Sequence, residues 1–365
     1  MNTEQQPLRT LKRVPRSPGY WQDVWRRFRR KLFPMLGLVF IGFLLIVAIF
    51  APAIAGTKPV VCEYKGNLYF PALGYLNTNW ENPIFRIDKF RGVYPDNLKK
   101  NDPKAWAVWP LVYQDPYRRV RANEWPGVPS AEPLMPPDRY HLFGTDPAGV
   151  DVFAKMVHGT RTALVVGFIS MGIAAIIGIA FGAIAGYFGG WIDAFVSRVI
   201  EVVMCIPTLI LILALIAVVE RPTIWHMMAI IGLTGWTGVA RLTRGEFLRL
   251  RNTEFVLAAI SLGIRRPTII FRHVLPNAMA PVLVPITFGI AAAILIEASL
   301  SFLGFGAPPP NPSWGTILDA GRANLSKWWL VTFPGVAILF TVLSYNLVGE
   351  GLQEATDPRL RDGRA

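Results

Sequence analysis

Long apolar runs alternate with polar segments along this chain. The six longest cover approximately residues 33–55, 163–187, 200–219, 223–241, 279–304 and 329–349. Each can cross a hydrocarbon core of roughly 30 Å as a helix rising about 1.5 Å per residue. The run from Leu164 to Ala185 carries no charge on any side, whereas a helix in a soluble protein keeps a polar face. The pattern predicts an all-α integral membrane protein with six transmembrane helices.

Composition and charge argue against one alternative, a nucleic-acid-binding protein. The 365 residues are 52% hydrophobic and 17% charged, which is typical of a membrane protein. A net charge of +13 also fits a nucleic-acid-binding protein. The basic residues, however, gather in two segments beside apolar runs, so we expect membrane lipid and no nucleic acid among the partners.

These two basic segments predict the orientation. Nine lysines and arginines precede position 33, and seven arginines lie between positions 241 and 277. Basic residues stay on the cytoplasmic side because their translocation is unfavourable. Four predicted helices separate the two segments, which places both on the same side. We therefore expect both chain ends in the cytoplasm (N-in/C-in) and a large extracytoplasmic loop between helices one and two.

The first apolar run ends in small residues that mimic a signal cleavage site, but the preceding basic segment is too long for a signal, so we expect a retained helix. In the large loop, aromatic and apolar residues flank Gly66 and Asn67, which predicts a β-hairpin within a small folded cap. Cys62 and Cys205 lie in different environments, so we expect two free thiols.

The chain lacks sequence patterns for catalysis. The four histidines are scattered without zinc-site spacing, so no metal is expected. No G-x-x-x-x-G-K-S/T motif occurs, and the chain therefore lacks the loop that cradles ATP phosphates. No nucleophile elbow is present either. We expect a non-catalytic protein with no catalytic residue and no cofactor, whose energy comes from another polypeptide.

Small residues recur every four positions at Ala174, Gly178, Gly182 and Gly186. This spacing leaves a smooth groove along one helix, where another backbone can approach closely. The groove serves either ordinary packing within the chain or contact with a partner chain.

The segment between predicted helices four and five is the most informative. Thr253 can cap a helix whose first turn holds Glu254, and Gly263 can end it. Ala258, Ala259 and Gly263 would share one side, which gives a bare flank that another protein could cradle. Pro276 is expected to end a second short helix before the membrane is re-entered.

This segment resembles the E-A-A-x3-G-x9-I-x-L-P signature of permeases of ATP-binding-cassette importers. Ala258, Ala259, Gly263, Leu275 and Pro276 are in register, while Leu257 and His273 depart from it. The resemblance implies a coupling helix that docks on an ATPase subunit and transmits its movement. The implied ATPase-coupling residues are Glu254, Ala258, Ala259, Gly263, Arg265, His273, Leu275 and Pro276.

Other motifs are similar to those of dipeptide, oligopeptide and nickel permeases. They are Leu142–Asp151 with Gly159 and Arg161, then Gly186–Asp193, Glu297–Gly306, Ser313–Gly315 and Asp357–Arg359. In the first of them, Val150 and Lys155 replace arginines. Asp146 and Asp151 near Arg161 can brace the start of helix two, or contact substrate.

The resemblance implies a type I importer permease fold in the bacterial inner membrane. It implies as partners two ATPase subunits or one fused ATPase, a second homologous permease and an extracytoplasmic substrate-binding protein. The enlarged loop, with its string from Lys58 to Pro71, is similar to the subgroup for oligopeptides and microcin C-like peptides; a dipeptide or nickel importer is the alternative. The expected parts are a basic cytoplasmic tail (1–32), helix one (33–55), the extracytoplasmic loop (56–161), a permease core (162–350) containing the coupling segment (251–277), and a cytoplasmic tail (351–365).

Glu297 is an isolated carboxylate within an apolar helix, where its charge costs about 2.5–3.5 kcal/mol. It either lines a translocation path or is a protonated or hydrogen-bonded group that fastens helices together. An ion channel or a secondary transporter would favour paired charges and broken inverted repeats within the membrane. A membrane enzyme would need a catalytic constellation. Neither pattern is found in the sequence.

Overall fold

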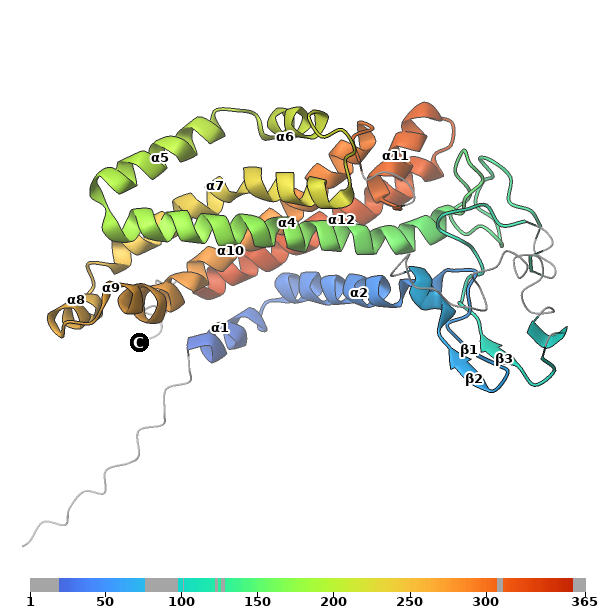
Figure 1. Ribbon diagram of the computed structural model, residues 1–365, viewed down its shortest axis with the longest axis horizontal. Helices are drawn as coiled ribbons and strands as arrows, with labels where there is room; N and C mark the ends of the chain where they lie inside the picture. The colour runs from blue at the N-terminus through green and yellow to red at the C-terminus, as the bar shows by residue number, and fades with distance from the viewer. Residues whose placement is uncertain are drawn as a thin grey trace, which may run out of the picture.

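The computed structural model describes residues 20–75, 98–100, 102–121, 124–125, 129–306 and 311–356. Long helices run along one axis, with short helices at one end and a small sheet at the other (Figure 1). The helices are α1 (Tyr20–Phe28), α2 (Leu32–Ile54), α4 (Val152–Phe188), α5 (Gly190–Met204), α6 (Thr208–Ala217), α7 (Ile224–Leu250), α8 (Glu254–Ser261), α9 (Arg266–Thr268), η3 (Ile269–Val274), α10 (Leu275–Phe302), α11 (Trp314–Ala323) and α12 (Trp329–Thr356). The short elements of the loop are β1 (Val61–Tyr64), β2 (Asn67–Tyr69), η1 (Pro71–Tyr75) and β3 (Trp106–Val108).

Within the described residues, four helices are long and apolar enough to cross a membrane: α2, α4, the continuous run Arg266–Phe302 and α12. The pair α5 and α6 makes a fifth if it is counted as one bent span. The chain is thus a helical protein with several candidate spans, as the apolar runs predict.

The prediction of one straight helix over residues 200–219 is wrong. The chain breaks between Met204 and Thr208, and α5 and α6 meet at an angle of 82°. Pro207 lies at this break; it lacks an N–H and disfavours helical geometry for the residue before it. Hydropathy does not reveal this break, because most of the residues on both sides of it are apolar.

Helix α4 begins earlier than predicted. Residues 152–161, assigned to the loop from their polarity, form its first turns. Asp151 is the N-cap and accepts a hydrogen bond from Ala154 N at 2.8 Å. His158 on the added turns bonds to Ala55 O at 2.8 Å, which ties α4 to the end of α2. The cap and this contact stabilise a segment that the search for apolar runs misses.

The glycine stripe of α4 packs against α7 of the same chain. A Cβ at Gly178 would lie 2.7 Å from Trp236 O, one at Gly182 2.5 Å from Ala240 O, and one at Gly186 2.6 Å from Arg244 O. Glycine at these positions therefore allows the two backbones to touch at three points over about two turns. The intrachain alternative accounts for the stripe.

The hairpin predicted around Gly66 is confirmed. Strands β1 and β2 pair antiparallel with Tyr64 opposite Asn67, and the turn places Lys65 and Gly66 at φ 50° and 76°. A two-residue turn with both φ values positive matches the right-handed twist of the strands. Strand β3 pairs with the other edge of β1.

Both described cysteines are free thiols, as predicted. Cys62 lies in β1 and is buried, and burial raises its pKa to about 11. Its thiol is therefore protonated at neutral pH and poorly reactive.

A buried polar network joins distant parts of the loop. Asp115 accepts hydrogen bonds from Thr57 Oγ1 at 2.8 Å and Tyr75 Oη at 2.9 Å. Arg118 bonds to both carboxylate oxygens of Glu124 at 2.7 Å. Burial, followed by the Asp115 charge, raises the pKa of Tyr75 well above its usual range, so the phenol stays protonated and donates to Asp115. The two hydrogen bonds to Asp115 span 40 and 58 residues of sequence, so the loop segment is a folded unit.

Candidate functional site

Segment 251–277 forms the end of the bundle opposite the sheet (Figure 1). Thr253 occupies the N-cap position of α8, but its hydroxyl donates to Leu250 O at 2.5 Å instead of capping the new helix. The predicted side-chain cap is thus wrong. The carbonyl of Leu250, at the end of the preceding helix, also accepts a hydrogen bond from Thr253 N at 3.0 Å, so Thr253 closes the turn between the two helices.

Gly263 ends α8, as predicted. Its φ is +71°, Gly263 N bonds to Ile260 O at 2.9 Å and Ile264 N bonds to Ala259 O at 3.1 Å. These two bonds form a Schellman motif, whose left-handed position favours glycine. The chain consequently reverses within three residues and returns toward the bundle.

The bare flank predicted for α8 is only partly present. Ala258 and Gly263 are exposed, but Ala259 is 5% exposed and packs inside the chain. Ala259 and Val256 join a cluster with Phe247 and Leu250 of α7 and Ala183 of α4. The small side chain at position 259 thus lets α8 approach its own bundle.

Exposed apolar side chains lie on α8, on the turn that follows it and on η3, and we call them together the outer face. Phe255 is 42% exposed, and Leu262 is 80% exposed. Large exposed apolar patches mark interaction surfaces. The members of the outer face are Phe255, Leu257, Ile260, Leu262 and Phe271.

The prediction that Pro276 ends a second short helix is wrong. It lies in the first turn of α10, which continues from α9 and η3 as one helical run, Arg266–Phe302. The six residues of η3, Ile269–Val274, are π-helical. The wider π turn accommodates a proline that lacks an N–H and would clash with the preceding turn of an α-helix. Leu275 is half-buried beside it and packs on the same cluster as Ala259.

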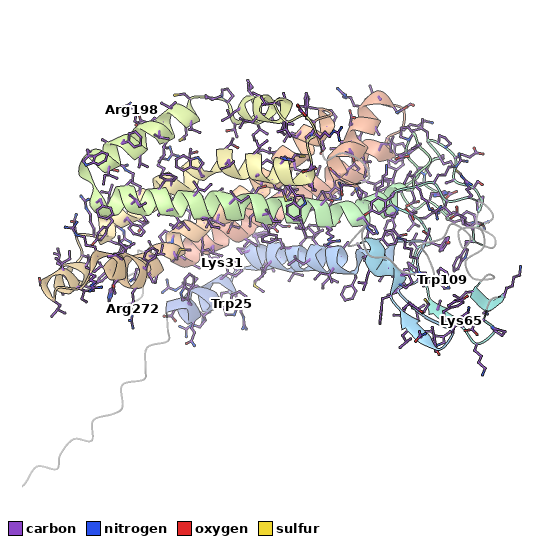
Figure 2. The ribbon with its side chains drawn as sticks, in the orientation of Figure 1. Trp25, Lys31, Lys65, Trp109, Arg198 and Arg272 are labelled. Carbon is purple, nitrogen blue, oxygen red and sulfur yellow. The ribbon has the colours of Figure 1, made fainter. Side chains whose placement is uncertain are left out.

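The charged candidates surround this segment. Glu254, Arg265 and Arg272 are exposed and His273 is half-buried. Figure 2 shows Arg272 at the end of the bundle. None of these four side chains has an ion-pair partner among the described residues, so their charges are available to another molecule.

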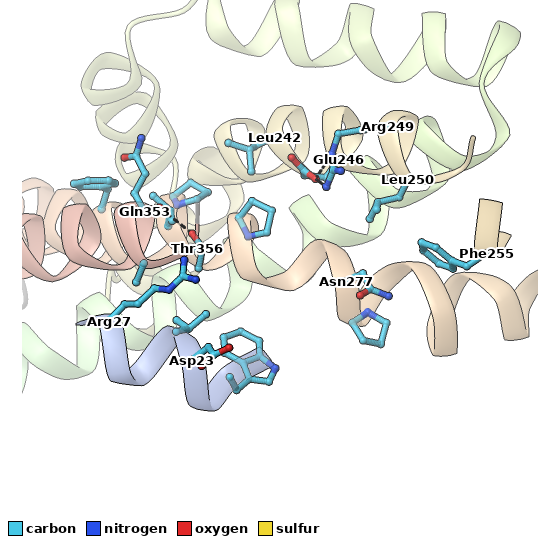
Figure 3. A pocket seen from close by; sticks show the side chains of 18 residues that line it. Asp23, Arg27, Leu242, Glu246, Arg249, Leu250, Phe255, Asn277, Gln353 and Thr356 are labelled. Carbon is cyan, nitrogen blue, oxygen red and sulfur yellow. Dashed lines mark hydrogen bonds and ion pairs between the residues drawn. The ribbon is translucent and has the colours of Figure 1, made fainter. Parts of the chain in front are cut away.

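A cavity of about 1000 Å³ lies beside the segment. Figure 3 shows its walls, which come from α1, α7, α8, α10 and α12. Pro276, Pro281, Pro285 and Phe288 line it from α10, and Phe255 of the outer face reaches its edge. A displacement of α8 would therefore change the wall of this cavity.

Glu297 lies far from this segment along α10. It is 1% exposed, and its Oε1 accepts hydrogen bonds from Ser301 Oγ at 2.8 Å and Ser313 Oγ at 2.7 Å. Ser313 is also the N-cap of α11. The carboxyl group thus connects two helices in a dry environment.

Two other family-like motifs meet at the same place. Trp314 Nε1 donates to Met156 O of α4 at 3.0 Å, and its ring covers Gly159, where a Cβ would lie 3.0 Å from Trp314 Cδ1. A Cβ at Gly315 would lie 2.5 Å from Ala298 O. Residues scattered over 160 positions therefore form one junction of α4, α10 and α11.

Replacing Glu297 separates its two predicted roles. Glu297→Gln keeps an oxygen for both serine hydroxyls, so the free energy of unfolding should change little. Glu297→Leu leaves both hydroxyls buried without that partner and should lower the unfolding free energy by about 1–3 kcal/mol. Detergent-induced unfolding measures this difference. A Glu297→Gln variant that is stable but loses transport would instead indicate a residue on the translocation path.

The predicted aspartate pair braces the start of α4 without Arg161. Asp146 accepts from Val150 N at 2.9 Å and forms an ion pair with Lys155. Asp151 bonds to His141 Nδ1 at 2.9 Å in addition to capping α4. Burial raises the pKa of Asp151, and the His141 hydrogen bond opposes that shift.

Arg161 lies instead in a small groove of about 380 Å³ lined by apolar residues of α2 and α4. His141 was missed by sequence reasoning because nothing in its local pattern distinguishes it. The sequence did offer a signal for Lys155 as the partner of Asp146, since a basic residue also stands at this position in the motif that the segment resembles.

The Gly186–Asp193 motif forms the turn from α4 to α5. Gly189 and Gly190 have φ values of 68° and 58°, which favour glycine. Asp193 forms a two-pronged ion pair with Arg244 of α7. Arg198 and Glu201 on α5 pair at 2.6 Å, as their spacing predicts. The Asp357–Arg359 motif lies outside the described residues.

Comparisons with known proteins give the family. A family model described as "Binding-protein-dependent transport system inner membrane component" matches residues 178–362, and one described as "N-terminal TM domain of oligopeptide transport permease C" matches residues 19–70. The chain is 35% identical to the inner membrane ABC transporter permease protein YejE of Escherichia coli K12, covering 92% of this chain and 96% of that protein.

Two further relatives agree. The oligopeptide transport system permease protein OppC of Bacillus subtilis is 30% identical over 95% of this chain and 92% of its own length. The dipeptide transport system permease protein DppC of Alkalihalophilus pseudofirmus is 38% identical over 69% of this chain and 80% of its own length. The family expected from the motifs is confirmed: this chain belongs to the inner membrane components of binding-protein-dependent transport systems, the permeases of ATP-binding-cassette importers.

Proposed function

We propose that this chain is the permease subunit of an importer that moves peptides across the inner membrane, and that segment 251–277 couples it to ATPase subunits. The observation that carries the proposal is the two-sided structure of α8. One side is packed on the helix bundle through Val256 and Ala259, and the other exposes the apolar outer face. Such a helix can be held by a second protein and still move the bundle.

The contacts suggest how that movement travels. The cluster around Ala259 joins α8 to α4 and α7, and the helical run Arg266–Phe302 leads from the segment to Glu297 without a break. At Glu297 the run is hydrogen bonded to α11. A tilt of α8 would therefore be transmitted along this helical run to the junction at the other end, where we propose that Glu297 fastens the helices.

The topology we propose has six crossings with both ends in the cytoplasm. They are α2, α4, the bent pair α5–α6, α7, α10 and α12. Helix α7 qualifies despite its polar residues, because its Trp236–Arg244 stretch lies against the glycines of α4, away from lipid. The loop 56–151 then lies outside and segment 251–277 inside.

The proposed partners are a second homologous permease, two ATPase subunits or one fused ATPase, and an extracytoplasmic substrate-binding protein. Peptides are the proposed cargo, since relatives are named for oligopeptide and dipeptide transport. The match to the oligopeptide permease OppC along nearly the whole chain favours an oligopeptide cargo. The string from Lys58 to Pro71 extends the proposal to microcin C-like peptides. A dipeptide or nickel importer is the second candidate, supported by the dipeptide-permease match in the core.

Reconstituted vesicles test the proposal. The full complex should accumulate a radiolabelled oligopeptide only when ATP, the binding protein and the ATPase are all present. A dipeptide and nickel ions in the same assay rank the alternatives. Uptake that persists without ATPase, driven by an ion gradient, would identify a secondary transporter and contradict the proposal.

Labelling of intact cells tests the topology separately. A single cysteine introduced at Leu262 should resist a membrane-impermeant maleimide, whereas one introduced at Leu111 of the outer loop should react, since both side chains are at least 80% exposed. The reverse pattern would place the coupling segment outside the cell.

A further inference from the structure

Helix α1 lies where the chain enters the membrane. It occupies Tyr20–Phe28, within the segment predicted to be a basic tail, and spanning helix α2 begins four residues later at Leu32. Figure 1 shows α1 beside the N-terminal end of α2. If α2 crosses a membrane from its first residue, α1 lies at the level of the lipid headgroups.

One side of α1 is fixed to the protein. Val24 and Phe28 are 7% and 3% exposed and belong to the main core. The Phe28 ring lies against Gly351 of α12, where a Cβ would come 2.9 Å from Phe28 Cε2. Lys31 forms an ion pair with Glu354 of the same helix. The rotation of α1 about its axis is therefore set by α12.

This fixed rotation leaves two tryptophans about half-exposed, and Trp21 also borders the cavity of about 1000 Å³. Trp21 and Trp25 are 49% and 48% exposed, and each lies three residues before a buried residue, so they extend the buried stripe sideways. The Trp25 ring stacks on Phe28 with centroids 5.9 Å apart. Indole rings favour the boundary between headgroups and acyl chains.

The remaining surface of α1 and its turn is cationic. Arg26, Arg29 and Arg30 are exposed, and the nearest acid, Asp23, is 4.0 Å from Arg26. Figure 2 shows Trp25 on α1 and Lys31 just after it. A basic face beside an apolar face is the pattern of helices that lie in a membrane interface and attract anionic lipids.

We propose that α1 is a binding surface for anionic phospholipids. Trp25 inserts at the top of the acyl chains, with Trp21 beside it at the edge of the cavity, and Arg26, Arg29 and Arg30 contact the phosphate groups. Charge complementarity and the position of α1 beside α2 favour lipid over a protein partner. The inference requires only that α2 crosses a membrane, and it holds whether or not α8 binds an ATPase.

Fluorescence quenching in nanodiscs tests it on the full chain. The fluorescence of these two tryptophans is obtained by subtracting the emission of the Trp21→Phe/Trp25→Phe variant from that of the unaltered chain. Lipids brominated near the top of the acyl chain quench this difference on contact. We expect brominated phosphatidylglycerol to reach half-quenching at a roughly tenfold lower mole fraction than brominated phosphatidylcholine. Three arginines at about fivefold each would give about a hundredfold without screening, and salt reduces this preference.

Two matched variants make the result decisive. Arg26→Lys/Arg29→Lys/Arg30→Lys keeps the charge and should keep the lipid preference. Arg26→Gln/Arg29→Gln/Arg30→Gln should make the two lipids equal, while both still quench. Equal quenching of the unaltered chain, a preference retained by the Gln variant, or no quenching by either lipid because a protein covers α1 would each overturn the proposal. An unchanged detergent-unfolding midpoint for each variant ensures that the folded chain is being compared.

Discussion

Substitution of Gly182 by alanine should lower the free energy of unfolding by roughly 3 kcal/mol. The new methyl group would lie 2.5 Å from Ala240 O and 2.7 Å from Thr243 Cβ. The first is a backbone oxygen in the middle of α7, so relief requires the two helices to separate. Overpacking of this kind costs about 1–3 kcal/mol where side chains can adjust, and a clash with backbone lies at the upper end.

Gly172 on the same helix provides the matched control. It is exposed, and a Cβ there would meet no atom within 4 Å. Gly172→Ala should leave stability unchanged or raise it by up to about 1 kcal/mol through helix propensity. Detergent-induced unfolding followed by circular dichroism compares the two variants. Equal effects would show that α4 and α7 are not in backbone contact in the membrane.

The double substitution Leu257→Glu/Ile260→Glu should abolish ATP-driven uptake while the permease stays folded. Both side chains are 51% exposed, so the isolated chain loses no buried contact. If an ATPase covers the outer face, two carboxylates are buried without partners on binding. Disruption of two central contacts at about 2 kcal/mol each weakens the ATPase complex by roughly a thousandfold.

Co-purification of the ATPase and uptake by vesicles measure this effect. Leu325→Glu is the control, because Leu325 is also apolar and 81% exposed but lies in the turn between α11 and α12 at the other end of the bundle. It should retain the ATPase fully. Retention by the double variant as well would show that the outer face is not the docking surface, whatever the chain transports.

Several features follow from local sequence alone. The spanning runs of α2, α4, α10 and α12 are visible because burial in lipid demands an apolar side chain at nearly every position. The β1–β2 hairpin and the end of α8 are visible because Gly66 and Gly263 adopt backbone angles that few other residues tolerate. The Arg198–Glu201 pair follows from helical spacing.

Other features depend on neighbours distant in the sequence. Ala259 fits the predicted small flank by pattern, yet it faces Phe247 and Leu250 inside the chain. Pro276 signals a helix end until the π turn of η3 is seen to accommodate it. Arg161 is close in sequence to Asp146 and Asp151 but contacts neither, because α4 carries it past them into the groove with α2. In each case the local pattern allows two arrangements.

The sequence by itself determined that this chain spans membranes with helices, that segment 251–277 contains a short helix ended by glycine, and that its family is the importer permeases. Tertiary structure decided which faces of those helices are used. It turned Ala259 inward and Leu257 and Ile260 outward, paired the glycines of α4 with the backbone of α7, and enclosed Glu297 between two serines. The physical reason is that hydropathy and backbone angles are properties of single positions, whereas burial of a particular side depends on which helices lie beside it.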